Sequence, residues 1–81
     1  MSVTLYALST CPYCRMTRKY LEDSAVQFDL HEIDLLDEDA RTAAVAKVRE
    51  LSGGASFPVI VVDDEVIVGF NKKRIKELLG L

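Results

Sequence analysis

The sequence Cys11-Pro12-Tyr13-Cys14 contains both cysteines of this 81-residue chain. It follows an alternating run, Val3 to Leu8, that predicts a β-strand. Pro12 suits the first position of a helix, where its missing N–H is not needed, and the residues after it favour helix. The sequence therefore predicts a strand-to-helix turn with Cys11 at the helix N-terminus.

The spacing of Cys11 and Cys14 suits a reversible disulfide. Side chains at i and i+3 lie on nearly the same face of a helix. The rise of about 1.5 Å per residue keeps the two Cα atoms within the roughly 4.4–6.8 Å that a disulfide needs. The helix N-terminus favours thiolate, so we expect the pKa of Cys11 below the roughly 8.5 of a free cysteine. Cys14 should be more buried and less acidic, which makes Cys11 the predicted nucleophile and Cys14 the resolving thiol.

Three other roles for the pair compete with redox chemistry. A structural zinc site needs four ligands, and only His31 remains to join the two cysteines. A structural disulfide here would close a loop too short to constrain the unfolded chain much. The third alternative is two unrelated core cysteines. A vicinal pair in a strand–helix–strand context favours redox chemistry over all three.

Length and composition indicate one domain, residues 1–81, with one modest core. The apolar fraction of 49% is sufficient for a globular fold, and no run approaches the roughly 18 apolar residues of a membrane span. The N-terminus lacks the pattern of a signal peptide, so we expect a cytoplasmic protein, where such a thiol pair is more often catalytic than structural. A net charge of −3 argues against nucleic acid as a partner.

The rest of the chain predicts an α/β fold in the order strand, helix, strand, helix, strand, strand, helix. The first two strands should be parallel through a right-handed crossover. Asp63-Asp64 makes the turn of an antiparallel hairpin, and Asp37 and Asn71 are expected N-caps of the second and third helices. The expected ranges are residues 3–8, 12–24, 26–34, 37–51, 59–62, 65–68 and 71–80.

With Cys-Pro-Tyr-Cys after a first strand in so short a chain, the sequence resembles a dithiol glutaredoxin. Phe57-Pro58-Val59 and Val68-Gly69-Phe70 support the resemblance, which covers nearly the whole chain. It implies a thioredoxin-like fold, a four-stranded mixed sheet with three helices in the order βαβαββα. It also implies a monomeric thiol–disulfide oxidoreductase that reduces protein or glutathione mixed disulfides. Such a protein binds no cofactor tightly and uses glutathione as co-substrate.

The resemblance also implies a substrate groove. In the family, the proline that matches Pro58 is cis and faces the thiol pair, and the residue before it offers backbone groups to the substrate. An ordinary trans proline at the start of a strand is the alternative. A cation at Arg15 would favour the Cys11 thiolate. The predicted substrate-binding residues are Tyr13, Arg15, Phe57, Pro58, Gly69, Phe70, Asn71 and Lys72.

The stretch from Val68 to Lys72 departs from the pattern of glutathione-using members. There an acidic side chain holds the γ-glutamyl end of glutathione, whereas this chain has Asn71 and Lys72. A lysine often found three residues before the first cysteine is Leu8 here. Gly69-Phe70 instead resembles the ribonucleotide-reductase-associated redoxins, which take electrons from thioredoxin reductase. Both donors, thioredoxin reductase and the glutathione reductase system, therefore stay open.

Two further hypotheses concern the surroundings of the thiol pair. Lys72 and Lys73 are cations at the N-terminus of a helix, where they oppose the helix dipole. Either a solvated surface tolerates them, or they form an anion site in which Arg15 and Arg18 complete a positive rim. A function from another class is an iron–sulfur cluster-binding module that uses Cys11 of two chains and glutathione. Pro12 stiffens the turn and disfavours this cluster. We expect no metal site built by the chain alone.

Overall fold

The computed structural model describes residues 2–54 and 57–81. In that part, the predicted order of four strands and three α-helices is confirmed, with one short 3₁₀ helix added. The elements are β1 (Val3–Ala7), α1 (Pro12–Asp23), β2 (Asp29–Glu32), η1 (Ile33–Leu35), α2 (Glu38–Ser52), β3 (Val59–Val62), β4 (Glu65–Val68) and α3 (Lys72–Leu79).

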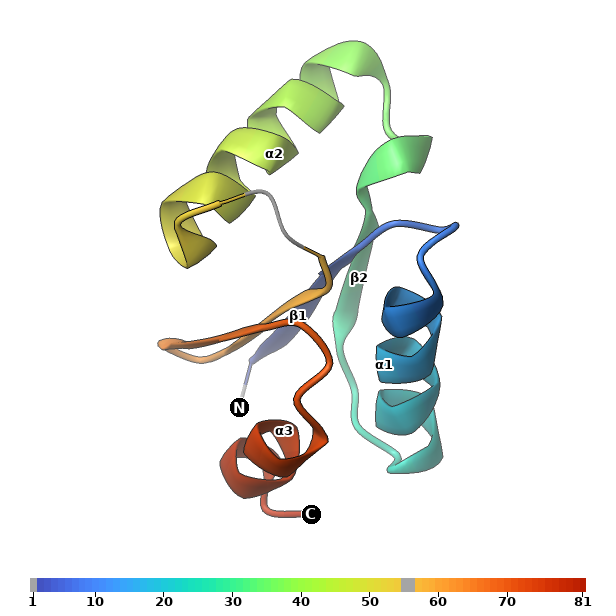
Figure 1. Ribbon diagram of the computed structural model, residues 1–81, viewed down its shortest axis with the longest axis vertical. Helices are drawn as coiled ribbons and strands as arrows, with labels where there is room; N and C mark the ends of the chain where they lie inside the picture. Colours follow the sequence, from blue (N-terminus) through green and yellow to red (C-terminus); the bar gives the residue numbers. More distant parts are fainter. Residues whose placement is uncertain (1, 55–56) are drawn as a thin grey trace.

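The strands form one mixed sheet in the order β2-β1-β3-β4 (Figure 1). β1 pairs with β2 in parallel and with β3 antiparallel, and β4 completes the hairpin with β3. Leu5 lies opposite Leu30 on one side and Ile60 on the other. This is the predicted thioredoxin-like fold. Because β1 and β2 are parallel, their carboxyl ends meet at one edge of the sheet, where α1 begins.

One face of the sheet packs against α1 and α3. Val3, Leu5 and Ala7 are the buried positions of β1, as the period of two in a strand requires. They belong to a core cluster to which the helices contribute Cys14, Leu21 and Ile75, and the hairpin contributes Ile60, Val62 and Ile67. The resolving position of the thiol pair is therefore part of the hydrophobic core.

α2 lies apart from α1 and α3 (Figure 1). Its residue Val48 is fully buried, as is Val59, whose side chain points to the opposite face from its neighbour Ile60. Asp37 caps the helix by accepting a hydrogen bond from the Ala40 N–H at 2.8 Å. Gly53 ends it at φ +78°, a left-handed conformation that glycine adopts without strain.

The second strand is shorter than the predicted range 26–34. Only Asp29–Glu32 pair with β1, opposite Thr4 to Ala7, and the pairing ends where β1 ends. The chain then turns into η1, which buries Ile33. The first strand ends at Ala7 rather than Leu8, and α1 ends at Asp23 rather than Ser24.

None of the helices in the described residues combines the length and the apolar character that a bilayer crossing requires.

Candidate active site

The two thiols occupy the turn from β1 into α1. Cys11 is the N-cap residue, Pro12 follows it at the start of the helix, and the Cys11 carbonyl accepts a hydrogen bond from the Arg15 N–H at 3.1 Å. Both cysteines are free thiols. Cys11 is partly exposed, whereas Cys14 is only 2% exposed. A reactant from solution therefore reaches Cys11 first.

The surroundings of Cys11 favour its thiolate. Partial burial opposes the charge, but a hydrogen bond from the Cys14 side chain and backbone hydrogen bonds from Cys14 and Tyr13 outweigh it. The pKa of Cys11 therefore lies below its ordinary value, as the helix N-terminal position predicted.

Cys14 shows the opposite behaviour. Burial raises the pKa of its thiol to about 11, although the Leu8 N–H donates a hydrogen bond to Sγ at 3.4 Å. The negative charges of Cys11 and Asp34 raise it further. The structure thus has the predicted asymmetry between a partly exposed, more acidic thiol and a buried, less acidic one.

Alkylation as a function of pH tests this asymmetry. Iodoacetamide reacts with thiolate, so the rate at each cysteine rises with pH and levels off above its pKa. We expect the Cys11 rate to level off below the pH typical of an ordinary thiol, and Cys14 to remain unmodified near neutral pH. Mass spectrometry of peptides after a short reaction at each pH measures both. Equal modification of the two cysteines at pH 7 would contradict the prediction.

The Phe57–Pro58 peptide bond is cis, as the resemblance implied. Pro58 is buried, and its carbonyl accepts a hydrogen bond from the Gly69 N–H at 2.7 Å. Gly69 has φ +82°. Phe57 and Phe70 pack on the same core cluster as Cys11. The structure thus brings the proline loop and the start of α3 to the core that supports the thiol pair.

Asn71 and Lys72 have partners within the chain. The Asn71 side chain caps α3 by accepting a hydrogen bond from the Arg74 N–H at 3.2 Å. The Lys72 ammonium lies 5.3 Å from the centre of the Tyr20 ring, a cation–π contact. The first turn of α3 is thus coupled to α1.

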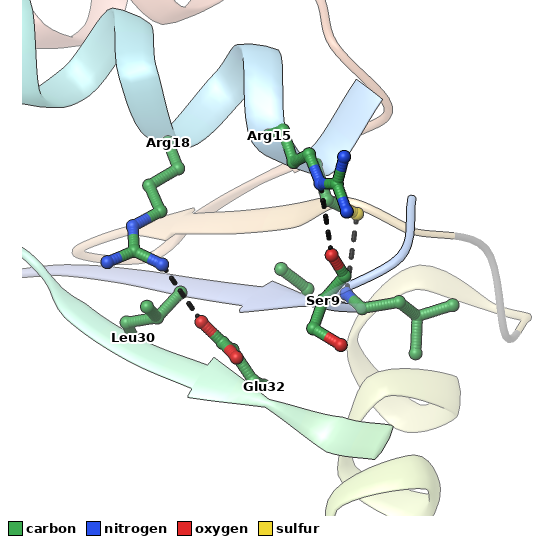
Figure 2. A pocket seen from close by; sticks show the side chains of 8 residues that line it. Ser9, Arg15, Arg18, Leu30 and Glu32 are labelled. Atoms are coloured by element: carbon green, nitrogen blue, oxygen red, sulfur yellow. Dashed lines mark hydrogen bonds and ion pairs between the residues drawn. The ribbon is translucent and has the colours of Figure 1, made fainter. Parts of the chain in front are cut away.

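The predicted positive rim is interrupted at Arg18. Its guanidinium forms ion pairs with Glu22 at 2.8 Å and with Glu32 at 2.9 Å. Figure 2 shows Arg18 reaching from α1 to Glu32 on β2. The charge of Arg18 is therefore shared with two carboxylates of its own chain.

Arg15 is directed at the turn that precedes the thiols. Its Nε donates a hydrogen bond to the Ser9 carbonyl at 3.1 Å (Figure 2). Arg15 and Cys14 both line a pocket of about 230 Å³ beneath this turn. In the described residues, the groups that lower the pKa of Cys11 are Cys14 and Tyr13. The role of Arg15 toward substrate stays a prediction.

Comparison with known proteins identifies the family. The glutaredoxin family model matches residues 3–67. The chain belongs to the glutaredoxin family. Its function is therefore that of a glutaredoxin-like redoxin, a thiol–disulfide oxidoreductase, as the thiol pair predicted.

Three similar proteins show how far this likeness to glutaredoxins extends. An uncharacterised glutaredoxin-like 8.6 kDa protein from the rubredoxin operon of Clostridium pasteurianum is 35% identical, over 95% of this chain and 96% of its own. The glutaredoxin-like protein NrdH of Lactococcus lactis (strain IL1403) is 34% identical, over 94% and 97%. The crystal structure of Methanosarcina acetivorans methanoredoxin has a TM-score of 0.94 and 40% identity, covering 99% of this chain and 85% of its own.

The sequence did not predict one contact that holds the turn between β1 and α1 in place. The Ser9 N–H donates to Asp34 Oδ1 at 2.9 Å, and the Ser9 hydroxyl donates to Oδ2. These two hydrogen bonds hold the pKa of Asp34 below its usual value. A signal was available, because Ser9 follows β1, Asp34 follows β2, and parallel strands bring their carboxyl ends together.

In residues 2–54 and 57–81, no three side chains of histidine, cysteine, aspartate or glutamate gather in a way that would hold an ion.

Proposed function

We propose that this glutaredoxin carries electrons to protein disulfides, with Cys11 as the attacking thiol and Cys14 as the resolving thiol. The observation that supports this assignment is the contrast between the two side chains. Cys11 is partly exposed and its pKa is lowered, whereas Cys14 is buried and its pKa is raised to about 11. A nucleophile needs access and thiolate character, and the resolving thiol needs neither until the mixed disulfide forms.

The reaction has two exchange steps. The Cys11 thiolate attacks one sulfur of the substrate disulfide, that bond breaks, and the other substrate sulfur leaves as a thiolate. Cys14 then loses its proton and attacks Sγ of Cys11, so the second substrate thiolate leaves and the Cys11–Cys14 disulfide forms. The substrate gains two electrons and the protein loses two. An external donor must reduce the protein again.

We also propose the remaining assignments that the family resemblance carries. Tyr13, Phe57, Pro58, Gly69 and Phe70 line the substrate groove, with Arg15, Asn71 and Lys72 at its rim. The protein acts as a monomeric single domain in the cytoplasm, a compartment that keeps thiols reduced.

Two observations favour thioredoxin reductase over glutathione as the donor. Asn71 and Lys72 offer no carboxylate that could pair with the ammonium group of glutathione. The Asn71 side chain already caps α3. The likeness to NrdH of Lactococcus lactis, a glutaredoxin-like protein of nearly the same length, agrees with the resemblance of Gly69-Phe70 to the reductase-associated redoxins. The glutathione system remains the competing donor.

A coupled assay with two donors tests the proposal. NADPH consumption is followed with insulin disulfides as acceptor, once with thioredoxin reductase and once with glutathione and glutathione reductase. We expect faster turnover with thioredoxin reductase. Faster turnover with glutathione would assign the protein to the glutathione-dependent members. If chemically reduced protein leaves insulin disulfides intact in a separate reaction, disulfide reduction itself is refuted.

A further inference from the structure

A recess of about 320 Å³ lies between α1 and the start of α3, and it shares Phe70 and Lys72 with the predicted substrate groove. Its apolar wall includes Met16, which is 49% exposed, and the rings of Tyr20 and Phe70, which meet edge to face with centroids 6.2 Å apart. The complete lining is Met16, Lys19, Tyr20, Asp23, Phe70 and Lys72. A hollow with mainly apolar walls suits an apolar side chain from another molecule.

Two residues of the recess, Met16 and Tyr20, lie on the same face of α1 as Tyr13, the residue before Cys14. Tyr13, Met16 and Tyr20 have the i, i+3, i+7 spacing that places side chains on one helix face. Tyr13, between the two cysteines, is 62% exposed. The helix rise places Met16 about 7 Å and Tyr20 about 14 Å from Cys11 along the axis, so the middle of the recess lies about 10 Å from Cys11. An extended peptide covers this distance in about three residues.

The charges beside the recess indicate which charge a partner should carry. Lys19 pairs with Asp23 at 3.6 Å, so these two charges offset each other. Lys72 is in none of the ion pairs formed by the described residues, and its ammonium lies over the Tyr20 ring. The recess thus has one uncompensated cation on a chain of net charge −3. This local positive charge complements a carboxylate, while the acidic remainder of the surface repels an acidic partner elsewhere.

We propose that the recess docks the protein partners of Cys11. The reacting cysteine of the partner meets Cys11, an apolar side chain about three residues away enters the recess, and a neighbouring carboxylate meets Lys72. This inference rests on the proposed function, because it requires Cys11 as the attacking thiol. It adds a specificity device, since a small disulfide cannot reach the recess.

Peptides joined to thionitrobenzoate through a disulfide provide the test. The Cys11 thiolate attacks the peptide sulfur, the peptide–thionitrobenzoate bond breaks, and the coloured thionitrobenzoate anion leaves. Cys14 then displaces the peptide thiolate and forms the Cys11–Cys14 disulfide. The chemically reduced protein supplies both electrons, so no reductase is needed. The substrates are Cys-Gly-Ser-Phe-Glu, Cys-Gly-Ser-Ser-Glu and Cys-Gly-Ser-Phe-Lys, each also made in reverse order.

We expect the phenylalanine–glutamate peptide, in one of its two directions, to react about tenfold faster than the serine–glutamate peptide, because a large apolar side chain leaves water. The phenylalanine–lysine peptide should be about threefold slower than its glutamate counterpart at low salt, and this difference should shrink at high salt. Equal rates with the phenylalanine and serine peptides in both directions would overturn the proposal.

Two variants localise the effect. Met16→Glu introduces a charge into the recess and should lower the preference for phenylalanine from about tenfold to about twofold. Lys47→Glu changes an exposed side chain on α2, away from the recess, and should keep the full preference. Far-UV circular dichroism verifies that both variants fold. An unchanged preference in Met16→Glu would also overturn the proposal. Release of thionitrobenzoate from no peptide at all would refute the proposed function itself.

Discussion

Replacement of the partly exposed thiol, Cys11→Ser, is expected to lower the rate of disulfide reduction by about 10³-fold or more, because a serine hydroxyl stays protonated near neutral pH and is a poor nucleophile toward sulfur. Cys11 is the thiol that combines access with a lowered pKa. The loss should be the same for insulin disulfides and for a small disulfide, since both need the same attacking atom. Insulin turbidity and thionitrobenzoate release measure the two rates.

The matched variant Cys14→Ser should fail differently. It keeps the first step, so the protein should accumulate as a covalent mixed disulfide with the substrate. Mass spectrometry without reductant detects this species, and added dithiothreitol should release it. If Cys11→Ser instead traps the substrate and Cys14→Ser does not, the two roles are reversed.

A truncation in the core, Leu21→Ala, is expected to lower the free energy of unfolding by about 3 kcal/mol. Leu21 is fully buried in the cluster that also holds Cys14 and Ile75. The loss combines the missing apolar contact with the cavity left behind. It is a large part of the roughly 5–15 kcal/mol that stabilises a small domain. Urea denaturation of the reduced protein, followed by circular dichroism, gives the midpoint and the slope.

Leu35→Ala is the control for this prediction. Leu35 is 68% exposed in η1, and its truncation should change the free energy of unfolding by no more than about 0.5 kcal/mol. Similar losses in the two variants would mean that the face of α1 bearing Leu21 does not anchor the helix to the sheet.

Most of the fold was predictable, because its signals are local. Alternation in Val3 to Ala7 and the continuous apolar run from Val59 to Val62 predict strands whatever else the chain contains. The caps at Asp37 and Asn71 act within three residues, and both form as expected. The second strand was predicted too long because its extent depends on which of its residues pair with β1, which is not a local property.

The candidate site also combines features that local sequence predicts with features that depend on the whole fold. The amino-acid sequence by itself predicted the thiol pair and the order of its acidities, because a separation of three residues at a helix start fixes the geometry of the pair within one turn. The burial that raises the Cys14 pKa comes from packing against residues of the sheet and of α3. Only the tertiary structure decided which partners the charged and polar groups take. The Asp34 carboxylate accepts a hydrogen bond from the Ser9 N–H, and the Lys72 ammonium lies over the Tyr20 ring. These contacts join residues 25 and 52 positions apart, so they depend on strand order and helix placement rather than on any local pattern.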